Sequence, residues 1–366
     1  MYIHEKEKWW EFSYNTDELI KKLGNIRKKE GLLLGKMSQL GFDFQNQSLL
    51  EHLSSEIVHS SAIEGESLNL KEVRSSIANK LGIDTAGLVP SSHHIDGIVE
   101  MLLDATQNYN TPLTEERLFS WHRVLFPYGY SGLYKIEVGQ YRSREMQVVS
   151  GQIGNEKVHF KAVEPNKIAF EMKEFIEWFN NSDELDGIIK AAIAHLRFLT
   201  IHPFDDGNGR IARALTDMLF ARTEKTSRRF YSMSVEIKKN QKSYYEILEK
   251  TQKGNGDITD WLLWFINCFD KALDTAFLKL QVILQKTHFW NYHQNVNFNE
   301  RQQKMINMLF EGFKGNLTTQ KWANKLNKCS QDTALNDIND LISHKILVKS
   351  KNGGRSTHYI FNDMNR

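Results

Sequence analysis

The residues best suited to chemistry lie in one stretch: His202, Pro203, Phe204, Asp205, Asp206, Gly207, Asn208, Gly209, Arg210 and, three residues on, Arg213. A neutral imidazole near pH 7 can accept a proton from an incoming hydroxyl. Asp206 offers the hard oxygen ligand that suits a Mg²⁺ ion bridging phosphates. Each feature alone is more often structural than catalytic. Their conjunction in one turn favours a site that binds a polyphosphate.

The glycines and arginines of this stretch also favour a polyphosphate site. Residues 207–209 can adopt backbone angles that aim successive N–H groups at one anion. A helix beginning here would add its positive N-terminal end. Arg210 and Arg213 are three residues apart, so they lie on nearly the same helix face and can contact two phosphates. Phe204 is expected to point inward and anchor the loop.

Several elements are predicted to position this loop. An apolar stripe predicts a core helix over 183–200, which ends just before His202. The next helix is expected at about 208–222. Two β-prone runs, 145–150 and 157–163, are separated by Gly151, Gly154 and Asn155 and predict a hairpin. Other helices are expected at about 17–37, 48–63, 70–81, 114–126, 166–180, 233–238, 241–252 and 259–285.

The whole chain of 366 residues is expected to be mainly α and to form three domains. A soft boundary rich in glycine, proline and serine at 82–92 would separate an N-terminal helical domain, 1–92, from a catalytic domain, 93–290. The tail, 291–366, predicts helices at about 302–310, 319–326 and 331–343, a strand at 346–349, a Gly353-Gly354 turn and a strand at 358–361. That order is typical of a winged helix.

Bulk composition narrows the setting of the protein. Cys268 and Cys329 are the two cysteines and are expected to be reduced thiols. The charged, aromatic start carries no secretory signal, and no apolar run is long enough to span a bilayer. A cytoplasmic protein is expected. The formal net charge of +2 neither favours nor excludes a polyanionic partner.

The stretch at 202–213 resembles the motif of the Fic (filamentation induced by cAMP) family, His-Pro-Phe-x-(Asp/Glu)-Gly-Asn-Gly-Arg-x-x-Arg, at every defined position. The resemblance covers roughly 95–285 and implies a Fic-type helical bundle with a β-hairpin flap. By resemblance, His202 is the general base and Asp206 the Mg²⁺ ligand. Residues 207–209 would bind phosphate through the backbone, with Arg210 on the β- and γ-phosphates and Arg213 on the γ-phosphate.

The implied reaction transfers AMP from ATP to a Ser, Thr or Tyr hydroxyl of a target protein and releases pyrophosphate. Relatives instead phosphorylate or transfer phosphocholine, but the phosphorylating branch departs from Gly-Asn-Gly-Arg, which this chain retains. Enzymatic removal of AMP from targets stays open as well. The flap residues Gln147, Val148 and Val149 would align an extended target segment by strand addition. Tyr244 and Tyr245 resemble a tyrosine pair that lines the base site; the alternative is that they are core aromatics.

The segment from Ser60 to Gly65 fits the family's inhibitory motif, Ser/Thr-x-x-x-Glu-Gly/Asn. The ordinary alternative is a helix end with a solvated Glu64 and Gly65 as the stop. Its place before the Fic core, on an amphipathic helix, favours inhibition, and the resemblance implies that Glu64 pairs with Arg213 and displaces the γ-phosphate. Holding the competent state at ~1% requires about 2.8 kcal/mol, and an exposed ion pair supplies only ~0–1 kcal/mol. Glu64 is therefore expected to be held in a pocket by its helix, in a bidentate pair.

The tail raises a second class of function, a DNA-binding transcription regulator with a vestigial or regulatory Fic domain. Residues 301–366 carry 11 Lys/Arg and 5 Asp/Glu, a difference of +6. The expected recognition helix, however, contains Asp332, Asp337 and Asp340 and no Lys or Arg, so phosphates would be repelled. Docking to a protein target, or to a second copy in a homodimer, is therefore favoured over DNA.

Overall fold

The computed structural model describes residues 2–84, 87–152, 155–181, 184–324, 329–350 and 357–362. The chain divides into two compact units, residues 1–276 and 277–366. The limits expected from the sequence, after residues 92 and 290, stay a prediction. The mainly α class is confirmed, since helices dominate both units. Within the described residues, no helix has the length and apolar character needed to cross a membrane.

Ten α-helices lie wholly within the first unit in its described part, after a short 3-10 helix, η1 (Ile3–Glu5). They are α1 (Thr16–Ser38), α2 (Phe42–Ile63), α3 (Leu70–Leu81), α4 (His93–Gln107), α5 (Glu115–Leu125), α6 (Pro165–Asn181), α7 (Gly187–Ile201), α8 (Asn208–Glu224), α9 (Met233–Lys239) and α10 (Gln241–Gln252). A further helix, α11 (Thr259–Tyr292), begins in this unit and ends in the second. It continues one to two turns beyond the predicted end.

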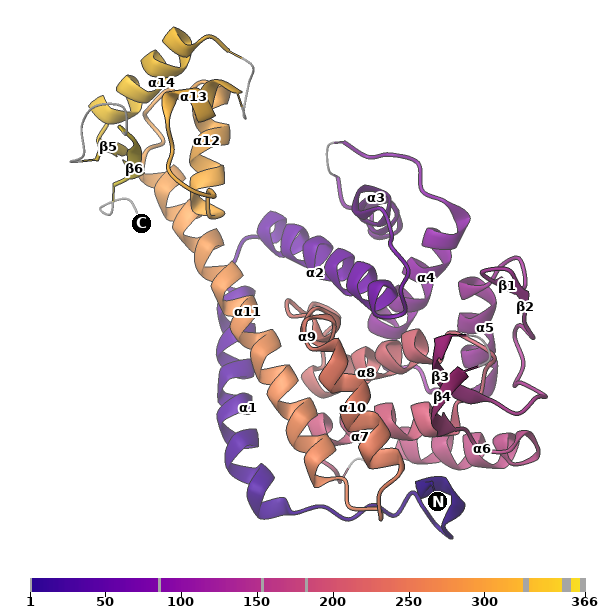
Figure 1. Cartoon of the computed structure of the whole chain (residues 1–366). Helices are drawn as coiled ribbons and strands as arrows, with labels where there is room; N and C mark the ends of the chain where they lie inside the picture. Colours follow the sequence, from indigo (N-terminus) through magenta and orange to yellow (C-terminus); the bar gives the residue numbers. More distant parts are fainter. Residues whose placement is uncertain are drawn as a thin grey trace. The chain divides into compact units, whose positions relative to one another are not determined.

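Helices α7 and α8 lie side by side in the interior of the first unit (Figure 1). Every residue of α7 from Ile188 to Ile201 is buried, as expected for a helix that is mostly apolar on all sides. The helix begins later than predicted because the Asp186 side chain caps it by accepting from the N–H groups of Ile188 and Ile189. The loop from α7 to α8 therefore starts from a rigid base.

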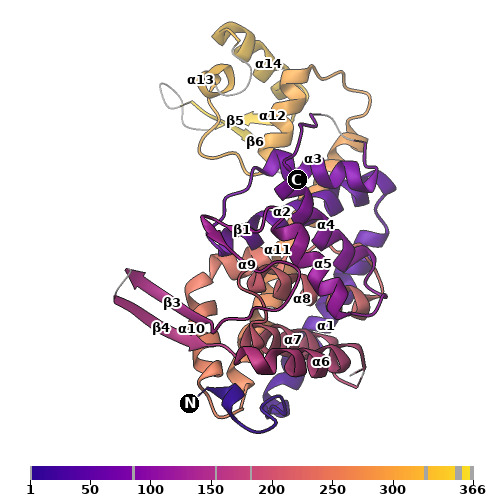
Figure 2. The same cartoon turned by 90° about the vertical axis from the view of Figure 1, so that its right-hand side faces the viewer.

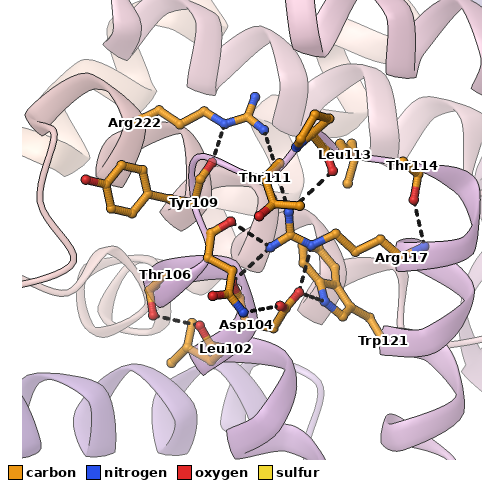
Figure 3. Close-up of polar contacts among 12 residues, drawn as sticks. Leu102, Asp104, Thr106, Tyr109, Thr111, Leu113, Thr114, Arg117, Trp121 and Arg222 are labelled. Atoms are coloured by element: carbon orange, nitrogen blue, oxygen red, sulfur yellow. Dashed lines mark hydrogen bonds and ion pairs between the residues drawn. The ribbon is translucent and has the colours of Figure 1, made fainter.

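The connection from α4 to α5 is fixed by Arg117 (Figure 3). Its guanidinium donates to the Asp104 carboxylate at 2.7 Å and to the carbonyl oxygens of Asp104, Asn108 and Thr111. Trp121 donates to the same carboxylate, also at 2.7 Å. The hydrogen bonds satisfy carbonyls at the end of α4 and set the position of α5. That position matters because α5 carries a histidine that contacts the 202–210 loop.

The predicted hairpin is present as β3 (Gln147–Gln152) and β4 (Asn155–Lys161), with the first strand two residues later than expected. The strands pair antiparallel with a register shift between Val148 and Val149. Gly154, expected in its turn, lies outside the described residues. Figure 2 shows the hairpin extending beside α10. A smaller pair, β1 (Tyr130–Ser131) and β2 (Tyr134–Lys135), was not predicted.

The second unit contains α12 (Glu300–Phe310), α13 (Thr319–Trp322), α14 (Gln331–Ser343) and the antiparallel strands β5 (Leu347–Lys349) and β6 (Tyr359–Phe361). Trp322, Ile338 and Leu341 are fully buried in its core. This order of helices and strands follows the expectation, and the assignment as a winged helix stays a prediction. The Gly353-Gly354 turn lies outside the described residues.

The acidic side chains of α14 do not all face outward. Asp337 is 5% exposed and accepts from Arg301 at 2.6 and 2.8 Å. Asp340 accepts from Gln302 of α12 at 2.7 Å. The expectation that three carboxylates face a phosphate backbone is therefore wrong for Asp337, because the Asp337 carboxylate is buried and pairs with Arg301 within the unit. Fewer carboxylates of α14 would therefore repel a phosphate backbone, and the preference for protein docking over DNA stays a prediction.

Candidate active site

The loop between α7 and α8 is held in one conformation by its own side chains. Phe204 points inward as expected: it is fully buried and stacks on His122 of α5, with ring centroids 4.3 Å apart. The Asn208 side chain accepts from the Phe204 N–H at 3.0 Å and donates to its carbonyl at 2.8 Å. His122 Nε2 lies 3.1 Å from the Asp206 carbonyl, while its Nδ1 accepts from the Gly139 N–H. These bonds make His122 a positioning residue of the loop, one that its sequence context did not reveal.

His202 ends α7 in a left-handed backbone conformation, with φ 52°. Its Nδ1 lies 3.3 Å from the Leu199 carbonyl, and because a carbonyl can only accept, that nitrogen carries the proton. Nε2, for which the described part of the chain offers no hydrogen-bond partner, is then the acceptor that a general base needs. Burial lowers the pKa of His202 to about 4, against smaller opposing effects of the Leu199 carbonyl, Glu64 and Asp206. The ring is therefore neutral at pH 7.

Arg142 is a structural residue that the sequence did not reveal. Its side chain is 2% exposed and donates to the carbonyls of His202 at 2.8 Å, Arg144 at 2.7 Å and Val163 at 2.5 Å. Its own N–H donates to the Pro203 carbonyl at 3.0 Å. Arg142 thus connects the base of the flap, through hydrogen bonds, to the loop that carries His202. No spacing signals this, because its partners are backbone carbonyls, and those of Val163 and His202 lie 21 and 60 residues away.

One oxygen of the Asp206 carboxylate faces the start of α8. One of its oxygens accepts from the Gly207 N–H at 2.6 Å, and the other accepts from the Ser131 hydroxyl of β1. No cluster of three or more potential metal ligands occurs among the described residues. A single carboxylate is nevertheless compatible with Mg²⁺, which commonly binds one or two protein carboxylates and completes its shell with phosphates and water.

The start of α8 has the features of an anion site. Gly207 precedes it in a left-handed conformation, φ 81°, and donates its own N–H to Asp206, while no described side chain caps the N–H groups of α8 itself. Gly209 follows in the first turn, where an added Cβ would come 2.1 Å from Glu64 Oε1. Arg210 and Arg213 are 6% and 3% exposed. A phosphate here would meet free backbone donors and two guanidinium groups.

Helix α2 occupies Arg213. The guanidinium donates to Glu64 Oε1 at 2.7 Å, to the Ser60 hydroxyl at 2.7 Å and to the Ser60 carbonyl at 3.0 Å. The ion pair expected between Glu64 and Arg213 is therefore present. The bidentate geometry expected from the sequence is wrong, since a single carboxylate oxygen makes the contact and Ser60 supplies the other acceptors. Burial alone would lower the pKa of Arg213, and the Glu64 charge helps raise it.

Gly65 sets the direction of the chain at the end of α2. It adopts φ 85°, its N–H donates to the Ala62 carbonyl, and the Glu66 N–H donates to the Ser61 carbonyl. This pair of hydrogen bonds is a Schellman motif, in which glycine takes the left-handed position. The expected stop at Gly65 is confirmed. The motif leaves Glu64 and Glu66 on either side of the glycine, and Glu66 contacts Arg210 at 3.2 Å.

Two sets of contacts hold α2 against the rest of the unit. Glu56, 2% exposed, accepts from the hydroxyls of Ser232 and Ser234 at the start of α9. Near the end of α2, Lys238 donates to the Ala62 carbonyl at 2.6 Å and Gln241 to the Ile63 carbonyl at 2.7 Å. The helix, rather than the Glu64 ion pair alone, thus keeps the carboxylate in place.

The remaining predicted residues lie around this centre. Tyr244 is 2% exposed, with its hydroxyl 2.8 Å from His195 Nε2, which is the core placement the sequence left open. Tyr245 is 42% exposed and donates to the Ile63 carbonyl at 3.3 Å. In the flap, Val148 and Val149 are exposed next to Gln147 at the start of β3. Contacts of these residues with a base or a target stay predictions.

Comparison with known families agrees with this geometry. Residues 112–220 match the Fic/DOC family model, a range that contains the loop, both arginines and α8. Over these residues the chain is similar to the Fic/DOC family. Residues 2–83, which include α2 and Glu64, match a separate model described as a domain of unknown function (DUF4172). Glu64 and Glu66, the carboxylates that contact Arg213 and Arg210, therefore come from outside the matched Fic/DOC range.

Curated relatives carry the same domain. The chain is 27% identical over 221 residues to "Protein adenylyltransferase Fic" of Drosophila willistoni. The aligned stretch covers 60% of this chain and 40% of that protein. The Drosophila melanogaster protein of the same name gives 27% over 221 residues, covering 60% and 41%. The match thus spans about two fifths of the length of these relatives.

Solved structures share the fold. A Fic family protein from Desulfovibrio desulfuricans G20 aligns with a TM-score of 0.53 at 17% identity, covering 93% of this chain and 96% of that chain. A Fic domain containing signaling protein from Bacteroides thetaiotaomicron VPI-5482 aligns with a TM-score of 0.52 at 23% identity, covering 70% and 95%. The Fic-type fold expected from the sequence is therefore confirmed.

Proposed function

We propose that this protein is an adenylyltransferase that transfers AMP from ATP to a hydroxyl of a target protein and is inhibited by its own Glu64. The observation that carries the proposal is the arrangement at 202–213: a neutral imidazole with a free Nε2 beside an uncapped helix start and two arginines. The curated relatives are named protein adenylyltransferases, which supports the same chemistry.

In the proposed reaction, the target hydroxyl oxygen attacks the α-phosphorus of ATP and the bond from that phosphorus to the bridging oxygen of the β-phosphate breaks. His202 Nε2 takes the hydroxyl proton, and pyrophosphate leaves with the bond electrons. Arg210 and Arg213, with the first N–H groups of α8, would hold the β- and γ-phosphates. Asp206 would hold Mg²⁺, which neutralises phosphate charge when bound.

Residues outside the loop would orient the reactants. Arg142 donates to the carbonyls of His202 and of Val163 at the base of the flap. These bonds would hold the imidazole in a constant position relative to a target segment aligned on the flap. Strand β3 pairs only with β4 in the described part of the chain, which leaves an edge for an added target strand. In the conformation seen here Ser60 and Glu64 accept from Nε and Nη2 of Arg213, two of the donors that a γ-phosphate would use.

Labelling with ATP carrying ³²P at either the α or the γ position tests the proposal. The Glu64→Gly variant, incubated with Mg²⁺ and a lysate as source of targets, should transfer the α label to protein above the level given by the double variant Glu64→Gly, His202→Ala in the same lysate, and should add no γ label above that level. An excess of γ label over the double variant would indicate phosphorylation instead. No transfer of either label would refute both reactions.

A further inference from the structure

We propose that Glu66 is a second inhibitory carboxylate of this site, which holds Arg210 and competes there with the phosphates of a nucleotide, while Glu64 holds Arg213. The inference rests on the proposed function for the identity of the nucleotide. It assigns a role to a residue just outside the segment of α2 that fits the inhibitory motif. The two carboxylates together then occupy both guanidinium groups of the loop.

The geometry of the helix end brings Glu66 to Arg210. In the Schellman motif around Gly65, Glu64 is the last residue of the helical path and Glu66 the second residue after it. The chain reversal at the glycine sends the two carboxylates to neighbouring turns of α8. Glu64 reaches Arg213 at 2.7 Å and Glu66 reaches Arg210 Nη1 at 3.2 Å.

Glu66 is held on its other side as well. Its second carboxylate oxygen is hydrogen-bonded to His94 Nε2, at the start of α4. Although burial alone would raise it, the contact with His94 and the charge of Arg210 lower the pKa of the Glu66 carboxyl. The side chain is thus an anchored anion, 32% exposed, against an arginine that is 6% exposed.

Arg210 is oriented toward this partner. Its guanidinium lies over the Phe126 ring at 5.0 Å, and its Nε has no hydrogen-bond partner among the described residues. A phosphate on the same guanidinium would lie beside the Glu66 carboxylate, and two anions repel at that separation. A phosphate that binds Arg210 therefore either displaces Glu66 or binds with lower affinity because Glu66 stays in place.

Calorimetric titration of the full chain with MgATP tests the proposal. In the Glu64→Gly background, Glu66→Gln and Glu66→Ala should each lower the Kd for MgATP about tenfold, which corresponds to about 1.4 kcal/mol. The Kd for AMP should stay unchanged, because AMP lacks the phosphates that Arg210 would contact. Glu116→Gln is the matched control: it removes a carboxylate from another Arg–Glu pair, with Arg123 on α5, and should alter neither Kd.

An unchanged or higher Kd for MgATP in both Glu66 variants, with thermal unfolding as in the parent, would overturn the proposal. A higher Kd would mean that Glu66 orients Arg210 for the nucleotide instead of competing with it. Equal tightening for AMP would also overturn it, and so would the absence of ATP binding in every variant. If the Kd falls as expected while no AMP is transferred to protein, the proposed function fails and the role of Glu66 stands.

Discussion

Replacing Glu64 by glycine removes the carboxylate that lies 2.7 Å from Arg213 and leaves the Ser60 contacts to that guanidinium in place. Residue 64 caps the end of α2 at φ −83° and ψ 8°, a conformation that glycine adopts without strain. Helix α2 should stay docked, because Glu56 and Lys238 anchor it independently of Glu64. The perturbation is therefore local.

The size of the effect follows from the burial of the two partners. Exposed ion pairs contribute ~0–1 kcal/mol, and hydrogen bonds to charged groups contribute about 1.5–3 kcal/mol. Arg213 is 3% exposed and Glu64 33%, so the contact falls nearer the second range. Release of about 1.4–2.8 kcal/mol corresponds to a 10- to 100-fold faster transfer of AMP.

The assay compares initial rates of α-³²P incorporation from ATP with Mg²⁺ for the parent, Glu64→Gly and Glu64→Gln. Glutamine retains an oxygen acceptor but loses the charge, so its rate should lie between the other two. Thermal unfolding should show that all three remain folded. An equal rate in parent and Glu64→Gly, with both folded, would show that this ion pair does not limit the reaction.

Three further outcomes are expected in the Glu64→Gly background. Arg142→Lys, which cannot reach all the carbonyls that Arg142 satisfies, should lower the free energy of unfolding by about 2 kcal/mol and kcat by about 100-fold; an unchanged kcat would remove Arg142 from the positioning of His202. Because the lowered pKa of His202, about 4, keeps the base neutral, kcat/KM should stay level from pH 8 to pH 5 and decline only toward pH 4; an inflection near 6.5 would contradict the burial of the ring. Asp206→Asn should raise the Mg²⁺ concentration for half-maximal rate at least tenfold, measured by Mg²⁺ titration, and an unshifted titration would exclude Asp206 as the ligand.

Local signals allowed much of this fold to be predicted. Helices α3 and α10 have the predicted bounds, and α5 begins one residue after its predicted start, where the Thr114 side chain caps it. Caps and apolar periodicity are encoded within a few residues, so a single sequence reveals them. The start of α7 was misplaced because Asp186, three residues after Asp183, is the residue whose side chain caps the helix.

The parts of the site that escaped prediction depend on contacts between distant segments. Arg142 and His122 act through carbonyl groups of the 201–206 loop, which leave no pattern in the sequence. Glu66 was missed because it lies just after the segment that fits the inhibitory motif, and its partner Arg210 is 144 residues away. The loop itself could be predicted, because its residues are contiguous and each has distinct chemistry.

In the proposed reaction His202 accepts the proton of the attacking hydroxyl. A comparison of α-³²P labelling of protein by Glu64→Gly with that by the double variant Glu64→Gly, His202→Ala under saturating MgATP tests this step. Loss of a general base typically costs about 10²- to 10⁴-fold, so labelling by the folded double variant should fall by at least 100-fold while MgATP still binds. Labelling by the double variant at the rate of Glu64→Gly would show that His202 does not accept this proton.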